Sequence, residues 1–173
     1  MKNYIKAVLY GYPLLENVDE DYQIHIQNKA ILSSRTDKSA FELAVALAKE
    51  ICEKQDLEWL KDCVEKALEK LTDVERELIA VRYFGKGRKL KKISLKDSGQ
   101  AQSEIASWSE RKYFRFQNRL AEKISSLLVR LGLTEEVFES RFAGTDIFQK
   151  LYRFVCDGKD QKIAQRAWRW ICG

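Results

Sequence analysis

Apolar residues recur at helical spacing along most of the chain, and the clearest repeat lies between residues 108 and 131. With an advance of about 100° per residue, this segment separates into an apolar side and a polar side. The apolar side comprises Tyr113, Phe116, Leu120, Ile124, Leu127 and Leu131, and the polar side includes Arg111, Arg115, Asn118 and Glu122. The pattern predicts one amphipathic helix of about six turns. Ser109 is its expected N-cap, because a serine hydroxyl can accept a hydrogen bond from a free N–H of the first turn.

The same periodicity predicts further helices on both sides of this segment. They span about residues 3–12, 14–33, 40–53, 57–71, 73–84, a short helix ending near 106, and then 134–143, 147–155 and 163–171. Ser39 with Glu42, and Thr72 with Glu75, have the spacing of capping boxes. Gly132 stands where a glycine ends a helix. With a single proline in 173 residues, the chain is expected to form an all-α multi-helix bundle.

Composition indicates a globular protein of the cytoplasm. The chain is 45% hydrophobic and 33% charged, which does not fit a disordered or fibrous chain. No signal peptide and no apolar run near 18 residues is present, so we expect no membrane association. The cysteines lack a C-x-x-C pair, so we expect reduced, buried thiols. His25 is the only histidine, and we assign it no chemistry and expect neither a metal site nor a cofactor.

Charge is distributed unevenly and divides the chain into three regions. Residues 1–71 carry a net charge of −3, residues 72–130 carry +7, and residues 131–173 carry +1. Between residues 82 and 96 there are seven basic residues and no acidic one. We therefore expect an N-terminal helical region at 1–71, a basic core at 72–131 and a C-terminal helical region at 132–173. A local surplus of this kind indicates a polyanionic partner.

The middle of the chain resembles a known DNA-binding motif. LTDVERELIAVRYF, a basic link, EIA and then SERKYFR opening a long helix are similar to the region 4 helix-turn-helix of sigma-70-type factors and of related phage and Firmicutes regulators. The resemblance covers roughly residues 71–124, and residues 1–71 show no likeness to the polymerase-binding region 2 of a complete sigma factor. It implies that Ile105 and Ala106 belong to a support helix. It also implies that the helix from Ser109 is a recognition helix, whose first residues enter the major groove.

We therefore expect a DNA-binding transcriptional regulator rather than an enzyme, because no catalytic constellation is visible. Arg111, Arg115 and Asn118 are expected to read bases, and phosphate contacts are expected from a second set. That second set comprises Arg88, Lys89, Lys91, Lys92 and Lys112, and Ser109 and Arg119 complete the expected interface. On its own, a basic helix face is more often only solvated.

Other partners remain open at this stage. The alternative to a DNA-binding protein is a helical protein-interaction module without nucleic-acid binding, in which the basic link is only a solvated connection. RNA polymerase or another regulator is a candidate partner. Arg166, Arg169 and Trp170 near the C-terminus could stack on nucleic acid. A packing or homodimer surface is the commoner use of such a cluster.

Overall fold

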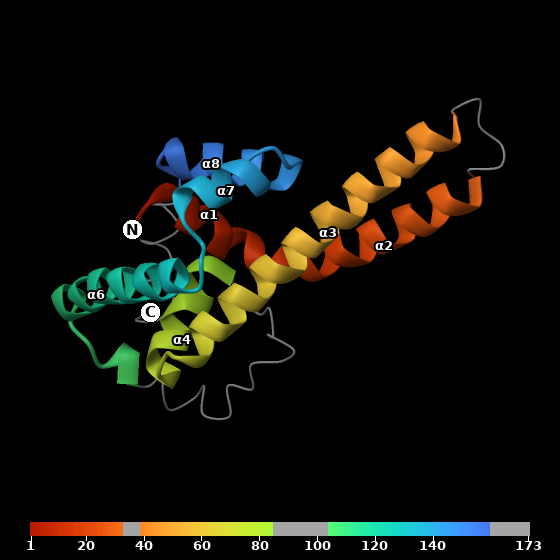
Figure 1. Ribbon diagram of the computed structural model, residues 1–173. Coiled ribbons are helices and arrows are strands. Elements are labelled where there is room, and N and C mark those ends of the chain that lie inside the picture. The colour runs from red at the N-terminus through yellow and green to blue at the C-terminus, as the bar shows by residue number, and fades with distance from the viewer. Residues whose placement is uncertain (33–38, 85–103, 160–173) are drawn as a thin grey trace. The chain divides into compact units, whose positions relative to one another are not determined.

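The protein is all-α in a computed structural model that describes residues 1–32, 39–84 and 104–159 (Figure 1). The described residues contain helices and turns but no strand, so the predicted fold class is confirmed. The labelled elements are α1 (Asn3–Gly11), η1 (Tyr12–Leu14), α2 (Leu15–Leu32), α3 (Ala40–Glu69), α4 (Asp73–Ile79), the π-helical turn η3 (Ala80–Phe84), α6 (Glu110–Arg130), α7 (Glu135–Arg141) and α8 (Asp146–Cys156). The helix-turn-helix inside this fold stays a prediction, because residues 85–103 lie outside the described residues.

The chain forms two compact units. The first, the larger unit, comprises Met1–Pro13 and Cys63–Gly173, and the second, the hairpin unit, comprises Leu14–Asp62. The predicted boundaries at 71 and 131 follow changes in charge, whereas these units follow contacts. In consequence the N-terminal helix α1 belongs with the C-terminal elements, which the charge pattern alone does not indicate.

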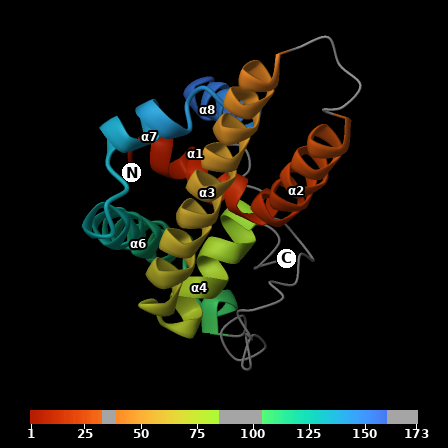
Figure 2. The same ribbon diagram turned by 45° about the vertical axis from the view of Figure 1, so that its right-hand side comes forward.

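In the larger unit, α1 packs against α8, and α7 lies beside both (Figures 1 and 2). The rings between these helices form a buried cluster in which Phe138 lies 5.7 Å from Tyr4 and 5.8 Å from Phe148, measured between ring centroids. Phe142 packs edge to face against Phe148, with ring centroids 5.9 Å apart. Burial of rings of this size stabilises the unit, because each removes a large apolar area from water.

In the hairpin unit, α2 and the first part of α3 run antiparallel (Figure 1). The predicted break between helices at 40–53 and 57–71 is wrong, because α3 is continuous from Ala40 to Glu69. The apolar pattern changes near residue 56, but the sequence there contains neither proline nor glycine to end a helix. An ion pair at helical spacing also lies across the expected break, from Lys54 to Glu58.

The predicted helix ends are confirmed where local chemistry defines them. The Thr72 side chain accepts from the Glu75 N–H while Glu75 accepts from the Thr72 N–H, which completes the capping box. Ser39 and Glu42 make the same reciprocal pair. Gly132 has a φ of 97°, a left-handed conformation that favours glycine after a helix.

Burial of the cysteines was predicted incorrectly. Cys63 is buried, as expected, but Cys52 and Cys156 are exposed. The helical pattern around these two residues did not show which side of α3 and α8 packs against neighbours, so the expectation rested on cysteine's general preference. His25 is exposed.

The described helices offer neither a membrane span nor a metal centre. Within residues 1–32, 39–84 and 104–159, no helix combines the length and apolarity needed to cross a bilayer. Within the same ranges, no group of three or more His, Cys, Asp or Glu side chains is arranged to hold a metal ion.

Candidate nucleic-acid interface

The predicted interface begins at the N-terminus of α6, where local sequence defines the helix start. Ser109 has extended backbone, and its hydroxyl accepts a hydrogen bond from the Lys112 N–H at 3.3 Å. Glu110 follows in the first turn, where an anion complements the helix dipole. The N-cap predicted from the sequence is confirmed, and α6 starts at Glu110.

The buried side of α6 differs from the predicted one. Tyr113, Leu120 and Ile124 are buried as expected, but Gln117 and Leu128 are buried too. Phe116, Leu127 and Leu131 are only half-buried. By the advance of about 100° per residue, the buried side is turned by about 40° from the predicted one. The outward direction of α6 therefore shifts toward Arg115 and Arg119 and away from Asn118.

A buried amide network explains this rotation. Gln117 accepts a hydrogen bond from the Arg82 guanidinium of η3 and donates one to the Tyr113 hydroxyl at 2.8 Å. Burial of an amide is tolerated when its hydrogen bonds are made. Gln117 lies four residues after Tyr113, on the same side of the helix, but its polarity gave no indication of burial. Hydrophobic periodicity therefore did not predict its burial.

A second polar contact joins α6 to α4. The Lys123 ammonium donates to the Glu75 carboxylate at 2.6 Å. Burial alone would raise the pKa of Glu75, but the Lys123 hydrogen bond, with the N–H and hydroxyl of Thr72, outweighs it and lowers the pKa. The Glu75 carboxylate thus caps α4 and anchors α6. Lys123 therefore holds α6 against α4 and is not one of the candidate DNA-contacting side chains.

The segment before α6 is anchored by two apolar side chains. Ile105, in a single helical turn, is fully buried, and Trp108 is 6% exposed. The Trp108 ring packs on Phe116 with centroids 4.8 Å apart. The Trp108 ring also contacts Lys112, whose ammonium lies 4.6 Å from the ring centroid. At this distance a cation is attracted to the face of an aromatic ring. Trp108 therefore orients Lys112, a role that the sequence alone did not reveal.

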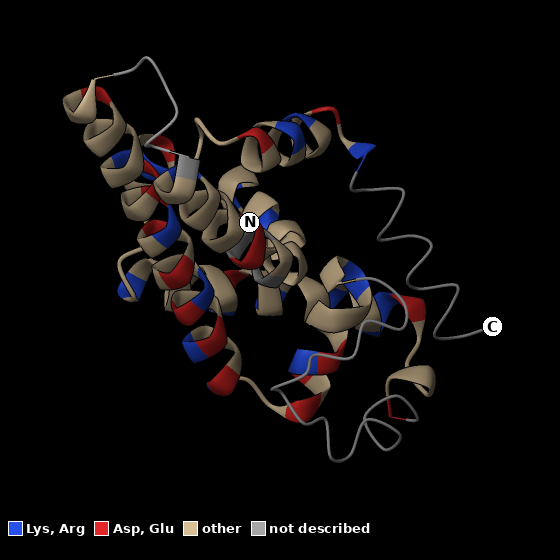
Figure 3. Cartoon of the chain, turned by 90° about the vertical axis from the view of Figure 1, so that its right-hand side faces the viewer, with Lys and Arg blue, Asp and Glu red and all other residues tan. Residues whose placement is uncertain are grey.

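The expected DNA-contacting side chains of α6 share one exposed face. Arg111, Lys112, Arg115, Asn118 and Arg119 are all exposed, and Ser109 is exposed at its end. Residues 111–121 contain no acidic side chain. By contrast, basic and acidic residues are interspersed along α3 (Figure 3). Among the described residues, no hydrogen bond or ion pair involves the side chains of Arg111, Arg115 or Arg119. Exposed guanidinium groups are of the type that binds phosphate and carboxylate anions.

The remainder of the expected interface lies outside the described residues. This applies to Arg88, Lys89, Lys91 and Lys92, and also to Arg166, Arg169 and Trp170. The continuity of a basic surface from the link onto α6 thus stays a prediction. The described part of the interface is the α6 face together with its anchors, Trp108 and Gln117.

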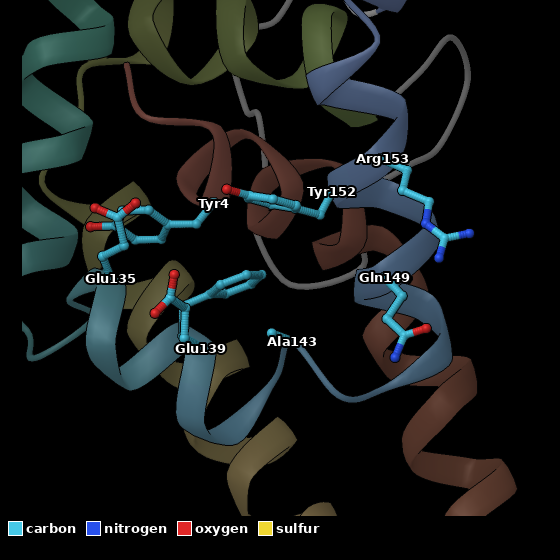
Figure 4. Close-up of a pocket in the computed structure, with 8 residues that line it drawn as sticks. Tyr4, Glu135, Glu139, Ala143, Gln149, Tyr152 and Arg153 are labelled. Carbon is cyan, nitrogen blue, oxygen red and sulfur yellow. The ribbon is translucent and has the colours of Figure 1, made fainter.

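A pocket of about 200 Å³ opens elsewhere on the larger unit (Figure 4). It is lined by Tyr4, Glu135, Phe138, Glu139, Ala143, Gln149, Tyr152 and Arg153. Lys2 pairs with Glu135 at 2.6 Å, and Glu139 and Arg153 add one charge of each sign to the lining. The lining therefore mixes both signs of charge. Burial, followed by the charges of Cys156 and Glu135, raises the pKa of the Tyr152 hydroxyl.

Comparison with protein-family models, with curated proteins and with solved structures found no match.

Proposed function

We propose that this protein is a DNA-binding transcriptional regulator that uses α6 as its recognition helix and the preceding basic link for phosphate contacts. The observation that carries the proposal is the exposed face of α6, on which Arg111, Arg115 and Arg119 lie on successive turns. Guanidinium groups at this spacing can make bidentate contacts to guanine or contacts to phosphate. The resemblance to sigma-70 region 4 supports the same function.

The geometry of α6 suits a major groove. The helix is 21 residues long, or about 31 Å, and its basic face occupies the N-terminal half, where recognition helices contact bases. The C-terminal half is anchored through Ile124, Leu128 and Lys123. The N-terminal half of α6 therefore has an exposed face, while the C-terminal half is held in place. A rigid recognition helix requires both.

Two features argue against a merely solvated face. A solvated face usually mixes both signs of charge, whereas residues 111–121 are basic or neutral. Like charges on adjacent turns also repel one another and cost a few tenths of a kcal/mol per pair. Such a cost is offset when an anion binds.

A binding titration with random duplex DNA at several salt concentrations tests the proposal. If about five phosphates are contacted, log K should fall with log salt with a slope near −4.5. The double variant R115A/R119A should weaken binding and flatten the slope. The control variant K150A/R153A removes two exposed cations of α8, so the two double variants have the same net charge. No binding at low salt, or equal losses for both variants, would contradict the proposal.

The second candidate is a protein-interaction module, and one observation favours it. Of the large apolar side chains that are exposed, Ile24, Ile31, Phe41, Val45 and Ile51 all lie in the hairpin unit. They do not overlap the basic face of α6 in sequence. A protein that binds partners through the hairpin unit alone would show no salt-dependent affinity for DNA in the same titration.

A further inference from the structure

The side of α3 that lies away from α2 carries a continuous apolar stripe within the hairpin unit. All its members are exposed, with Phe41 at 77% and Val45 at 53%. The α3 stripe consists of Phe41, Ala44, Val45, Ala48, Ile51 and Cys52. By helical periodicity these residues cover an arc of about 120°. This is the width that a helix normally presents to a core.

The partner helix α2 occupies the opposite side of α3. There, Glu53 accepts a hydrogen bond from the Tyr22 hydroxyl at 3.0 Å, and Glu50 bonds to the Lys29 ammonium. Leu43 and Leu47 on this side are half-buried. Helix α3 thus has two apolar sides, and α2 covers one of them. A contiguous exposed apolar patch of this kind marks an interaction surface.

We infer that the α3 stripe binds the same stripe of a second copy of this chain, with the two α3 helices antiparallel. In this arrangement the side-chain sizes along the two stripes are complementary. About a two-fold axis between Ala46 and Leu47, Phe41 of one copy meets Cys52 of the other, and Val45 meets Ala48. Each large side chain then faces a small one, as knobs-into-holes packing requires. A parallel pair would place Phe41 against Phe41 and Ala48 against Ala48.

Charge beside the stripe supports the same orientation. Glu42 and Lys49 are exposed along one edge of it. In an antiparallel pair, like edges meet, so Glu42 of one copy comes beside Lys49 of the other, and the two-fold axis repeats this contact. Within its own helix Lys49 makes only a long contact, 3.8 Å, to Glu53. In a parallel pair this edge would instead meet the edge formed by Ala44 and Ile51.

Sedimentation equilibrium of the full chain at several concentrations tests the association. We expect a monomer–dimer equilibrium, and V45E should raise its dissociation constant about 100-fold or more, because each copy would bury a charge. A48E should raise the dissociation constant to a similar extent. The matched control is I24E, since Ile24 is 55% exposed on α2 but lies outside the α3 stripe. Far-UV circular dichroism should show unchanged helicity for all three.

The inference is overturned if the wild type stays monomeric at every concentration, or if I24E dissociates the dimer as strongly as V45E. It does not depend on DNA binding, because the association is measured without DNA.

Disulfide cross-linking tests the orientation. In a C156S/C172S background, which retains Cys52 and the buried Cys63, mild oxidation of F41C should give a covalent dimer through Cys52 of the second copy. The parent without F41C should not cross-link through Cys52 at that rate. An antiparallel pair separates the two Cys52 residues by about 16 Å along the axis, beyond the reach of a disulfide. Rapid cross-linking of the parent would show a parallel pair and overturn the antiparallel arrangement.

Discussion

Glu75 in the first turn of α4 accepts a 2.6 Å hydrogen bond from Lys123 of α6, although 48 residues separate them in sequence. The same carboxylate closes the capping box with Thr72. One side chain therefore stabilises both the start of α4 and the position of the candidate recognition helix. Because α6 is held by this contact and by Gln117, its exposed face has a defined direction.

The Glu75 contact should make stability depend on pH. Its pKa is lowered in the folded protein, so the stabilisation is complete above the unfolded pKa, about 4.3, and is lost as pH falls through the folded value. E75Q keeps a side chain that can cap but removes the charge. We expect wild type to exceed E75Q by about 0.5–1 kcal/mol at pH 7, since Lys123 is partly exposed.

Urea unfolding at pH 7, 5, 4 and 3 measures this difference. The advantage of wild type should shrink as pH falls below the unfolded pKa and be smallest at pH 3. K123M should cost a similar amount at pH 7, and the double variant should cost little more than either single one. A difference that stays constant with pH would show that the charge of Glu75 has no part in it.

Gly11 should not tolerate a side chain. A Cβ at this position would lie 2.8 Å from Cε1 of the buried Phe148 ring and 3.2 Å from Cδ1 of Leu151. Since Phe148 is fully buried, α1 and α8 would have to separate, and G11A should cost about 1–3 kcal/mol. G144A is the control, because nothing lies within 4 Å of its Cβ position. Equal melting temperatures for both variants would mean that α1 and α8 do not pack this closely.

Gln117 should be more important for stability than its exposed neighbour Asn118. Q117L retains the volume but removes the acceptor that pairs with Arg82, and it should cost about 1–3 kcal/mol. N118L should change stability by less than about 0.5 kcal/mol. Denaturant unfolding of both variants measures these changes in stability. A loss for Q117L as small as that for N118L would contradict the burial of Gln117 and favour the orientation predicted from the periodicity.

Arg115 should distinguish base reading from general attraction to phosphates. On a duplex selected from a random pool, R115A should lose about 1–3 kcal/mol of binding free energy, with little change on scrambled DNA. R130A, at the exposed C-terminal end of α6, should bind both duplexes like the wild type. Equal losses for R115A on both duplexes would make Arg115 a phosphate contact. Failure to select any sequence would favour the interaction module.

The sequence by itself determined the features that depend on neighbouring residues. The all-α class, the capping boxes at Ser39 and Thr72, the N-cap at Ser109 and the turn at Gly132 were predicted correctly. Helical periodicity and capping act within a few residues, so their patterns are legible in the chain. The exposure of the arginines on α6 could be predicted for the same reason.

Tertiary structure decided the features that depend on distant residues. Arg82 is 35 positions from Gln117, and their hydrogen bond turned the buried side of α6 away from Phe116. The packing of α1 on α8 placed the two ends of the described chain in one unit. The cover that α2 gives to one side of α3 left Phe41, Val45 and Cys52 exposed on the other. An apolar pattern shows that a side chain favours burial, but only its neighbours in space determine whether it is buried.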